Sequence, residues 1–427
     1  MLEEINISYQ LKTFGCKVNT YDSGLLEKRL SLAGYENKEN PKVHVLNTCA
    51  VTSEATAEAL RTIRKIKLKH PKSIVVVTGC AAQVDTEKFL NVPGVDLVIA
   101  NSHKSQLETL IYKYLHGELS DRAYKSNIFK KEDLEEGGGT KDSHTRSFLK
   151  IQDGCNSFCT YCVIPFARGK SRSLSIESIR LRANELLLAG SREIVLTGVH
   201  IGDYEFGIEN LIEDLLLRTR VSRLRLTSFE PIELTDRLME LFSDPRLCPH
   251  FHMSIQSAST KVLSRMKRKY TSCEVEKSLK RIANQVPGAF VGIDVIAGFP
   301  GEGDFEFSET VNQLESLPWT RLHVFPYSER PGTYAIKLDG KNFHSAIASR
   351  ADFLRKMSNL RICSEANKQV GSIKKVLWLK NNIGISRDYW SVKLAGDISH
   401  IEANTESKVK ICALEKANLN LIGEIVK

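Results

Sequence analysis

The sequence predicts an α/β protein with three parts: an N-terminal doubly wound parallel sheet, a central open barrel of six β/α units, and a small C-terminal β-barrel. Strand-like runs alternate with helical patterns twice along the chain, before residue 116 and again between residues 146 and 326. Such alternation is typical of parallel sheets. Short strand-like runs after a long helical pattern near the end favour a compact β-barrel.

Composition places the chain among globular proteins. Its 427 residues are 42% hydrophobic and 26% charged, which suffices for two or three domains with sizeable cores. No apolar run approaches the roughly 18 residues of a membrane span, and the first ten residues lack the order of a signal peptide. We therefore expect a cytoplasmic protein without a membrane partner, whose ten cysteines indicate metal binding or catalysis before disulfides. The net charge of +9 is compatible with a polyanionic partner.

Residues 1–132 read as the first domain, with four strands and four helices. The strands are expected at Ile5–Leu11, Val43–Asn47, Ser73–Thr78 and Val95–Ala100, and the helices at Tyr21–Ala33, Thr52–His70, Asp85–Leu90 and Ser105–Leu115. Gly34 should end the first helix and Thr52 should cap the second. The segment Arg61–Lys72 carries six basic side chains, which form either a solvated face or a contact with an RNA backbone.

A cysteine follows each of the first three predicted strands: Cys16, Cys49 and Cys80. The carboxyl ends of parallel strands share one edge of the sheet, where such sheets bind ligands. We therefore expect a three-cysteine cluster site there. The alternative is three small buried hydrophobic residues at strand ends.

Residues 133–145 are acidic, then glycine-rich, then polar, which predicts an interdomain linker. The barrel is expected at 146–340 and begins with an apolar strand that leads into Cys155, Cys159 and Cys162. Three thiolates in this CxxxCxxC spacing can hold a [4Fe–4S] cluster with one iron left open. A zinc site would need a fourth ligand, for which His200 is a candidate. A disulfide with a spare thiol is a further alternative, although nothing indicates secretion.

Five more barrel strands are expected, at Glu193–Thr197, Arg223–Thr227, His250–Ile255, Phe290–Ala297 and Leu322–Pro326. Helical patterns such as Ile176–Ala189 and Leu234–Phe242 lie between them. Barrel active sites gather at the carboxyl ends of the strands. Polar and glycine residues there are candidate cofactor contacts, with ordinary turn chemistry as the alternative: Gly198, Ser228, Glu230, Gln256 and Gly298.

Basic residues follow the cysteine loop and the fourth barrel strand, and either surround the barrel mouth for a polyanion or form an ordinary solvated surface. They are Arg168, Lys170, Arg172 and the run Arg265–Tyr270. The remaining cysteines have no partner spacing, and we assign no role to His250, His252 or His323, nor any beyond the zinc alternative to His200.

The last part begins with a connecting helix at 341–370, predicted over Asn342–Val370 and ended by Gly371. A β-barrel at 371–427 follows, with strands at Lys374–Leu379, Tyr389–Leu394, Ser407–Cys412 and Leu421–Val426. Ten basic and six acidic residues lie between 368 and 427. Trp378, Tyr389 and Trp390 would either stack on RNA bases or pack in the core.

The cysteine loop resembles that of the radical S-adenosylmethionine (SAM) superfamily, and its pairing with Cys16, Cys49 and Cys80 resembles the methylthiotransferases over the whole chain. The segments FGCKVNTYDS and NTCAVT resemble the subgroup that acts on N6-threonylcarbamoyladenosine next to the tRNA anticodon. The subgroups acting on N6-isopentenyladenosine or on a ribosomal-protein aspartate remain alternatives. Outside the enzymes, a zinc-stabilised RNA-binding protein is the competing interpretation.

The resemblance implies two [4Fe–4S] clusters and SAM as cofactors, with Tyr161 against the adenine of SAM. The cluster at Cys155, Cys159 and Cys162 would reduce SAM, and the resulting deoxyadenosyl radical would start C–S bond formation at C2 of the target adenine. The other cluster would hold the sulfur, and a separate SAM would supply the methyl group. The C-terminal barrel resembles a TRAM domain that binds the tRNA anticodon stem-loop, and an electron donor such as flavodoxin or ferredoxin is implied. The family often has threonine after Glu302; here Gly303 stands there, which predicts a different local loop shape.

Overall fold

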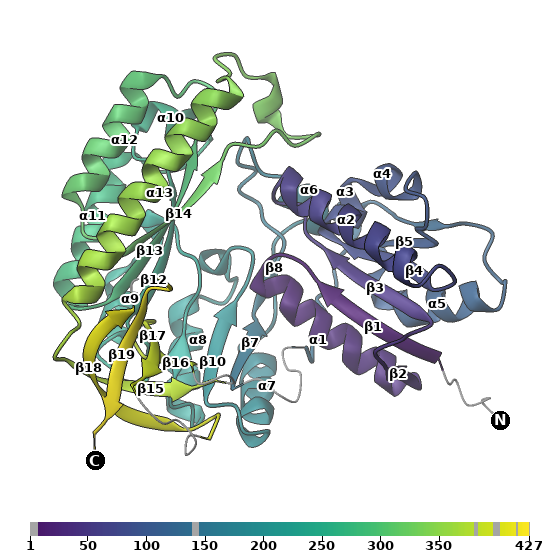
Figure 1. Ribbon diagram of the computed structural model, residues 1–427, viewed down its shortest axis with the longest axis horizontal. Coiled ribbons are helices and arrows are strands. Elements are labelled where there is room, and N and C mark those ends of the chain that lie inside the picture. The colour runs from purple at the N-terminus through teal and green to yellow at the C-terminus, as the bar shows by residue number, and fades with distance from the viewer. Residues whose placement is uncertain (1–6, 139–144, 380–382, 396–401, 416, 427) are drawn as a thin grey trace.

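The computed structural model describes residues 7–138, 145–379, 383–395, 402–415 and 417–426. Figure 1 shows an N-terminal sheet beside a larger barrel, with the C-terminal strands below the barrel. No helix of the described residues is long and apolar enough to cross a membrane.

The N-terminal part is a six-stranded sheet in the order β2-β1-β3-β4-β5-β6, with every neighbouring pair parallel. The strands are β1 (Ile7–Thr13), β2 (Tyr35–Asn37), β3 (Val43–Thr48), β4 (Ile74–Gly79), β5 (Leu97–Ala100) and β6 (Ala123–Tyr124). The four predicted strands are present, although residues 5 and 6 lie outside the described part. The sequence analysis missed β2 and β6, which are short edge strands with few residues to show a pattern.

Helices cover both faces of this sheet. Leu26, Leu30 and Ile111 belong to one hydrophobic cluster with the strands, and Ile63 and Phe89 belong to a second one. The segments are α1 (Lys17–Leu32), α2 (Ser53–Lys69), α3 (Cys80–Val84), α4 (Thr86–Leu90), η1 (Asn101–Gln106), α5 (Leu107–Leu115) and η2 (Ile128–Lys130). The Thr52 hydroxyl accepts from Ala55 N and so caps α2.

The central part has six parallel-paired strands: β7 (Arg146–Lys150), β10 (Glu193–Thr197), β11 (Leu224–Arg225), β12 (His250–Gln256), β13 (Phe290–Ala297) and β14 (Arg321–Pro326). They form two three-stranded sheets, β11-β10-β7 and β12-β13-β14. Two isolated parallel bridges, Leu224 to Leu247 and Phe229 to Met253, connect the sheets. Strands β7 and β14 are not paired with each other among the described residues, so the barrel is open, as predicted.

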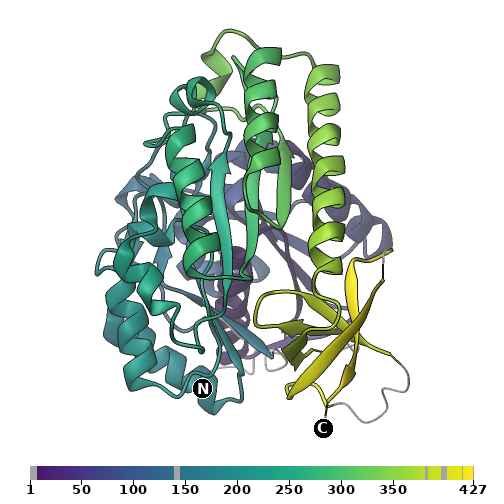
Figure 2. The ribbon, with the colours of Figure 1, turned by 90° about the vertical axis from the view of Figure 1, so that its left-hand side faces the viewer.

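The barrel helices lie outside the strands in Figure 2, where α13 stands next to α12 and leads down to the C-terminal strands. They are α6 (Ile164–Arg168), α7 (Ile176–Leu188), η3 (Ile201–Asp203), α8 (Ile208–Arg218), η4 (Pro231–Glu233), α9 (Asp236–Leu241), α10 (Thr260–Arg265), α11 (Ser272–Gln285), α12 (Asp304–Ser316), η5 (Tyr334–Lys337) and α13 (His344–Asn367). A short ribbon of β8 (Gln152–Asp153) and β9 (Arg172–Ser173) flanks the cysteine loop.

The C-terminal strands close into a five-stranded barrel, in the order β15-β16-β17-β19-β18. They are β15 (Ile373–Trp378), β16 (Ile383–Ser386), β17 (Ser391–Leu394), β18 (Glu406–Glu415) and β19 (Asn420–Ile425). Trp378 and Trp390 are buried in its core, and Tyr389 packs against His250 of the central barrel with ring centroids 3.9 Å apart. The idea that these aromatic rings stack on RNA is therefore wrong.

The predicted linker is only partly described, because residues 139–144 lie outside the described part. On its near side, Glu135 pairs with Arg29 at 2.8 Å, and the Gly138 carbonyl accepts two hydrogen bonds from Arg182. The described end of this segment is therefore anchored to both α1 and α7.

Two neighbouring cysteine sites as the candidate active site

The N-terminal cysteines meet at the carboxyl edge of the sheet. Cys16 precedes α1, Cys49 follows β3, and Cys80 is the first residue of α3. Gly15 has a φ of +90°, and a Cβ at this position would lie 2.5 Å from Cys49 Cβ, so the turn before Cys16 packs directly on Cys49. Burial, followed by the neighbouring Cys80 and Cys16 thiols, raises the pKa of Cys49 to about 12.

A buried arginine from the central part reaches this site. Arg168, at the end of α6, donates from Nε to Cys80 Sγ over 3.2 Å and is 4% exposed. The side-chain amide of Asn101 donates to the same sulfur over 3.7 Å. The Cys80 sulfur therefore has two N–H donors, one of which belongs to a cation.

The second set of cysteines lies on the loop between β8 and α6. Gly154 has a φ of +75°, and a Cβ there would lie 1.9 Å from Lys170 O, so only glycine allows the loop to leave the strand at this angle. Cys155 N donates to Gly169 O over 3.1 Å, and Cys162 N donates to Cys159 O over 2.9 Å. Burial, followed by the Cys159 thiol, raises the pKa of Cys162 to about 12.

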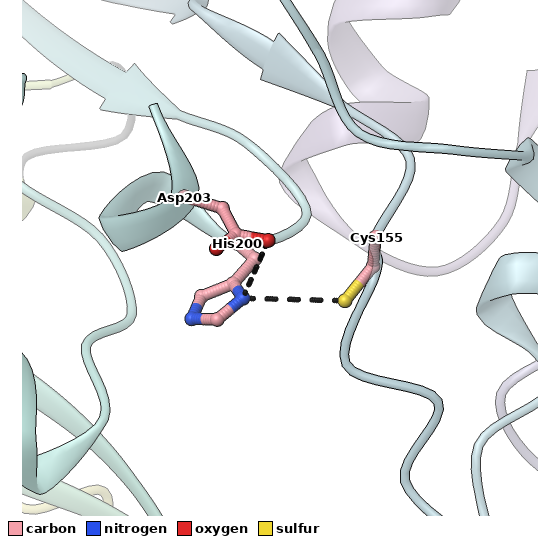
Figure 3. A group of neighbouring side chains, drawn as sticks. All are labelled: Cys155, His200 and Asp203. Carbon is pink, nitrogen blue, oxygen red and sulfur yellow. Dashed lines mark hydrogen bonds and ion pairs between the residues drawn. The ribbon is translucent and has the colours of Figure 1, made fainter. Parts of the chain in front are cut away.

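His200 completes this site beside Cys155, as Figure 3 shows. Its Nδ1 lies 4.0 Å from Cys155 Sγ and 3.5 Å from Asp203 Oδ2, and its Nε2 lies 2.5 Å from Glu233 Oε1. Although burial acts against the charged form, hydrogen bonds with Cys155 and Glu233 raise the pKa of His200 to about 11. Burial also opposes the Cys155 thiolate, but the hydrogen bonds with His200 and Ser157 lower its pKa. The sequence contained a signal for this role, because His200 lies in the strand-end segment TGVHIGDY.

A second buried arginine serves the same loop. Arg268 donates from Nη1 to Cys159 Sγ over 3.1 Å, and its Nη2 lies 3.0 Å from Glu230 Oε1. The sequence analysis expected Arg168 and Arg268 among surface residues at the barrel mouth, but both side chains are buried, at 3% and 5% exposure. That expectation was wrong because their hydrogen-bond partners come from distant parts of the chain.

The donor sets bear on the choice between a cluster and a single zinc ion. Tetrahedral Zn–S bonds of about 2.3 Å place two thiolates about 3.8 Å apart. Among the described residues, which include all six cysteines, neither set has its three sulfurs within 4.8 Å of one another, whereas the ligand atoms of Cys155, His200 and Asp203 do lie within that distance. A [4Fe–4S] cluster is held by thiolates on separate irons. Two sets of three cysteine sulfurs fit such clusters, and Cys155, His200 and Asp203 are the group that fits a single ion.

Among the other predicted cofactor contacts, Tyr161 lies on the second cysteine loop and Glu230 contacts residues beside it. Tyr161 packs edge-on against Phe299 at 6.2 Å between ring centroids. Glu230 accepts from Arg268 and lies 3.5 Å from His200. Gln256 has a φ of +63° at an irregularity of β12, and Ser228 follows β11 with a half-exposed side chain.

The two predicted glycines make close approaches to protein atoms. A Cβ at Gly198 would lie 3.0 Å from Gln152 Oε1, and one at Gly298 would lie 2.6 Å from Ile347 Cγ1 on α13. Packing alone therefore accounts for a glycine at Gly298, and its cofactor contact stays a prediction.

Comparisons with known proteins agree with this architecture. Residues 8–100 match the family described as uncharacterized protein family UPF0004, and residues 149–314 match the radical SAM superfamily. A threonylcarbamoyladenosine tRNA methylthiotransferase MtaB from Aquifex aeolicus is 34% identical, with 90% of this chain and 96% of the relative covered. The protein of the same name from Bacillus subtilis is 38% identical over 77% of this chain and 75% of its own.

Among solved structures, the radical SAM methyltransferase TsrM from Kitasatospora setae shares the fold, with a TM-score of 0.56 at 14% identity over 78% of this chain and 76% of that one. The identity and coverage of the two bacterial relatives show the family more directly than this distant structure does. The chain belongs to the radical SAM methylthiotransferases, in the group of the threonylcarbamoyladenosine tRNA methylthiotransferases.

Proposed function

We propose that this chain adds a methylthio group to C2 of N6-threonylcarbamoyladenosine at position 37 of tRNA, next to the anticodon. The relatives named for this activity support the proposal. So does one observation in this molecule: Arg168, six residues after Cys162, contacts Cys80 of the other cysteine set. A single side chain thus connects the two sets and shows that they lie near each other. A reaction that uses both sets requires this proximity.

Cys155, Cys159 and Cys162 would hold the radical SAM cluster, which when bound supplies the electron that cleaves SAM. Around it, Arg268 donates to the Cys159 sulfur, and the hydrogen bond with His200 lowers the pKa of Cys155. Glu233 fixes the orientation of the His200 ring from its other nitrogen.

Cys16, Cys49 and Cys80 would hold a second cluster, which carries the sulfur to be inserted. Cys49 and Cys80 are 5% and 2% exposed, whereas Cys16 is exposed. This site therefore opens on the side of Cys16, where a substrate base can approach. We assign SAM contacts to Tyr161, Gly198, Ser228, Glu230, Gln256 and Gly298, because they lie at strand ends around the other cluster loop.

We place substrate recognition in two surfaces. The C-terminal five-stranded barrel is read as a TRAM-like RNA-binding domain on its position and basic charge. The second surface is a groove of about 420 Å³ between α2 and the sheet, whose lining includes four lysine or arginine side chains and two glutamates. We call it the basic groove and define it by Lys12, Arg61, Lys65, Lys69, His44 and His70. RNA phosphates bind such surfaces with release of counterions.

The remaining assignments follow from this function. We read the N-terminal sheet as doubly wound and the domains as residues 1–132, 146–340 and 371–427, with 133–145 as linker and 341–370 as connecting helix. The enzyme would act in the cytoplasm, where its tRNA is found, and would take electrons from a small protein such as flavodoxin or ferredoxin.

The test is a reaction with purified components. Protein reconstituted with iron and sulfide under anaerobic conditions is incubated with SAM, a reductant and tRNA that carries threonylcarbamoyladenosine. We expect mass spectrometry of the nucleosides to show the 2-methylthio product. Product from isopentenyladenosine tRNA instead would move the assignment to that subgroup. A colourless protein that contains zinc and makes neither product would contradict the enzyme class.

A further inference from the structure

Arg168 is the centre of a buried ion network between the two halves of the site. Its Nη2 lies 3.0 Å from Asp22 Oδ2 on α1, and its Nη1 lies 2.9 Å from Asp153 Oδ1, two residues before Cys155. Its remaining N–H, on Nε, is directed at Cys80 Sγ. One guanidinium thus contacts helix α1, Cys80 at the start of α3, and strand β8, which leads to the second cysteine set.

The two carboxylates of this network do not neutralise all of its cations. Lys104 and Lys150 also pair with Asp22, at 3.2 and 2.6 Å, and Lys150 pairs with Asp153 at 3.2 Å. Each of these five residues is less than 9% exposed to solvent. Three cations therefore face two anions, in a region where an uncompensated charge is costly. Besides these carboxylates, the Arg168 guanidinium also contacts the Cys80 sulfur.

We propose that Arg168 is a positioning residue shared by the two cysteine sites, which holds the Cys80 sulfur against the ion network and raises the reduction potential of the N-terminal cluster. The inference rests on the proposed function, because it needs a cluster at Cys16, Cys49 and Cys80. Hydrogen bonds and positive charge at a cluster sulfur stabilise the reduced state, which carries one more negative charge.

The experiment uses full-length protein in which Cys155, Cys159 and Cys162 are alanine, so that only the N-terminal cluster remains. Iron and sulfide analysis first establishes whether this parent holds a cluster. A redox titration followed by electron paramagnetic resonance then gives its midpoint potential. Arg168→Gln should favour the oxidised state by about tenfold, a fall of about 59 mV for a one-electron couple. Arg168→Lys keeps the charge and should shift the potential less.

Arg172→Gln is the matched control. Arg172 lies on the neighbouring ribbon and donates to Lys131 O and Arg168 O, and not to a cysteine of the described residues. We expect the midpoint potential of the cluster in Arg172→Gln to equal that in the parent.

The outcomes separate the two hypotheses. A parent without iron overturns the second cluster of the proposed function, and this inference with it. A parent with a cluster whose potential is the same in Arg168→Gln overturns the role of Arg168 alone. If Arg168→Gln keeps its fold by circular dichroism but loses iron, the role of Arg168 in holding the cluster is supported. The midpoint potential of Arg168→Lys then tests its effect on the reduction potential. A lysine variant that holds iron and has a midpoint potential lowered by more than about 59 mV, which is tenfold for a one-electron couple, would contradict the electrostatic role.

Discussion

Arg268 Nη1 lies 3.1 Å from Cys159 Sγ, and the same side chain pairs with Glu230 and donates to Ser254 O. Arg168 stands in the same relation to Cys80. Each cysteine set therefore has one buried arginine that is held by carboxylates and directed at one sulfur. The arrangement is repeated although the two arginines come from unrelated parts of the chain.

Replacement of Arg268 by methionine should weaken the radical SAM site. The change removes the N–H and the charge at Cys159 and leaves Glu230 without its arginine partner. Groups that orient metal ligands typically contribute 10- to 100-fold to affinity or activity. We expect a loss in that range in SAM cleavage by the reconstituted enzyme. Arg265→Met is the control, because Arg265, the last residue of α10, donates to Pro300 O and Asp339 O and to no cysteine of the described residues. Equal losses in both variants would contradict the specific role.

The contact between the halves at Arg330 should contribute strongly to stability. Arg330 is 4% exposed as a side chain and donates to Asp85 Oδ2 over 2.7 Å, which links the segment after β14 to the loop before α4. Its replacement by alanine leaves a mostly buried carboxylate without its cation, which costs about 3 kcal/mol. Urea unfolding measures this loss. The exposed pair Arg237–Glu213 is the comparison, and Arg237→Ala should leave the unfolding midpoint unchanged.

Stability should fall in mild acid through His44. Burial, followed by the positive charges of His70 and Lys67, lowers the pKa of His44 to about 4. The unfolded chain, with a histidine pKa near 6.5, binds more protons than the folded chain between pH 6.5 and 4. The free energy of unfolding therefore decreases as the pH falls through this window. We expect thermal unfolding of His44→Asn to depend less on pH there than the parent does, and an identical dependence would refute this origin.

Charge reversal in the basic groove should weaken RNA binding. The triple variant Lys12→Glu, Lys65→Glu, Lys69→Glu removes three cations from the groove, one on β1 and two on α2. If each neutralises a phosphate, the slope of log affinity against log salt should become shallower by about 0.7–0.9 per lysine. Fluorescence anisotropy with a labelled anticodon stem-loop measures this slope. Reversal of Lys113, Lys277 and Lys280, which lie on α5 and α11, serves as the control, and an equal loss in both would assign the effect to net charge.

Much of the fold could be predicted because its buried strands are long apolar runs in the sequence. The strand Phe290–Ala297 was predicted with its observed bounds, and Cys16, Cys49 and Cys80 do follow three neighbouring strands. Short strands such as β16, which has four residues including Gly384, gave too short a pattern. Arg168 and Arg268 were misplaced because a run of basic residues looks the same whether solvated or buried. The burial of the two arginines depends on partners that only the tertiary fold brings near them. These partners are Asp153, Glu230 and the cysteine sulfurs.

The most direct measurement is mass spectrometry of tRNA nucleosides from cells that lack this gene, complemented with wild type, Cys49→Ala or Cys159→Ala. The account predicts that 2-methylthio-N6-threonylcarbamoyladenosine disappears without the gene, returns with wild type and stays absent with either cysteine variant. Restoration of the nucleoside by Cys49→Ala would contradict the requirement for both cysteine sites. An unchanged level in cells without the gene, and without a second such enzyme, would contradict the tRNA substrate itself.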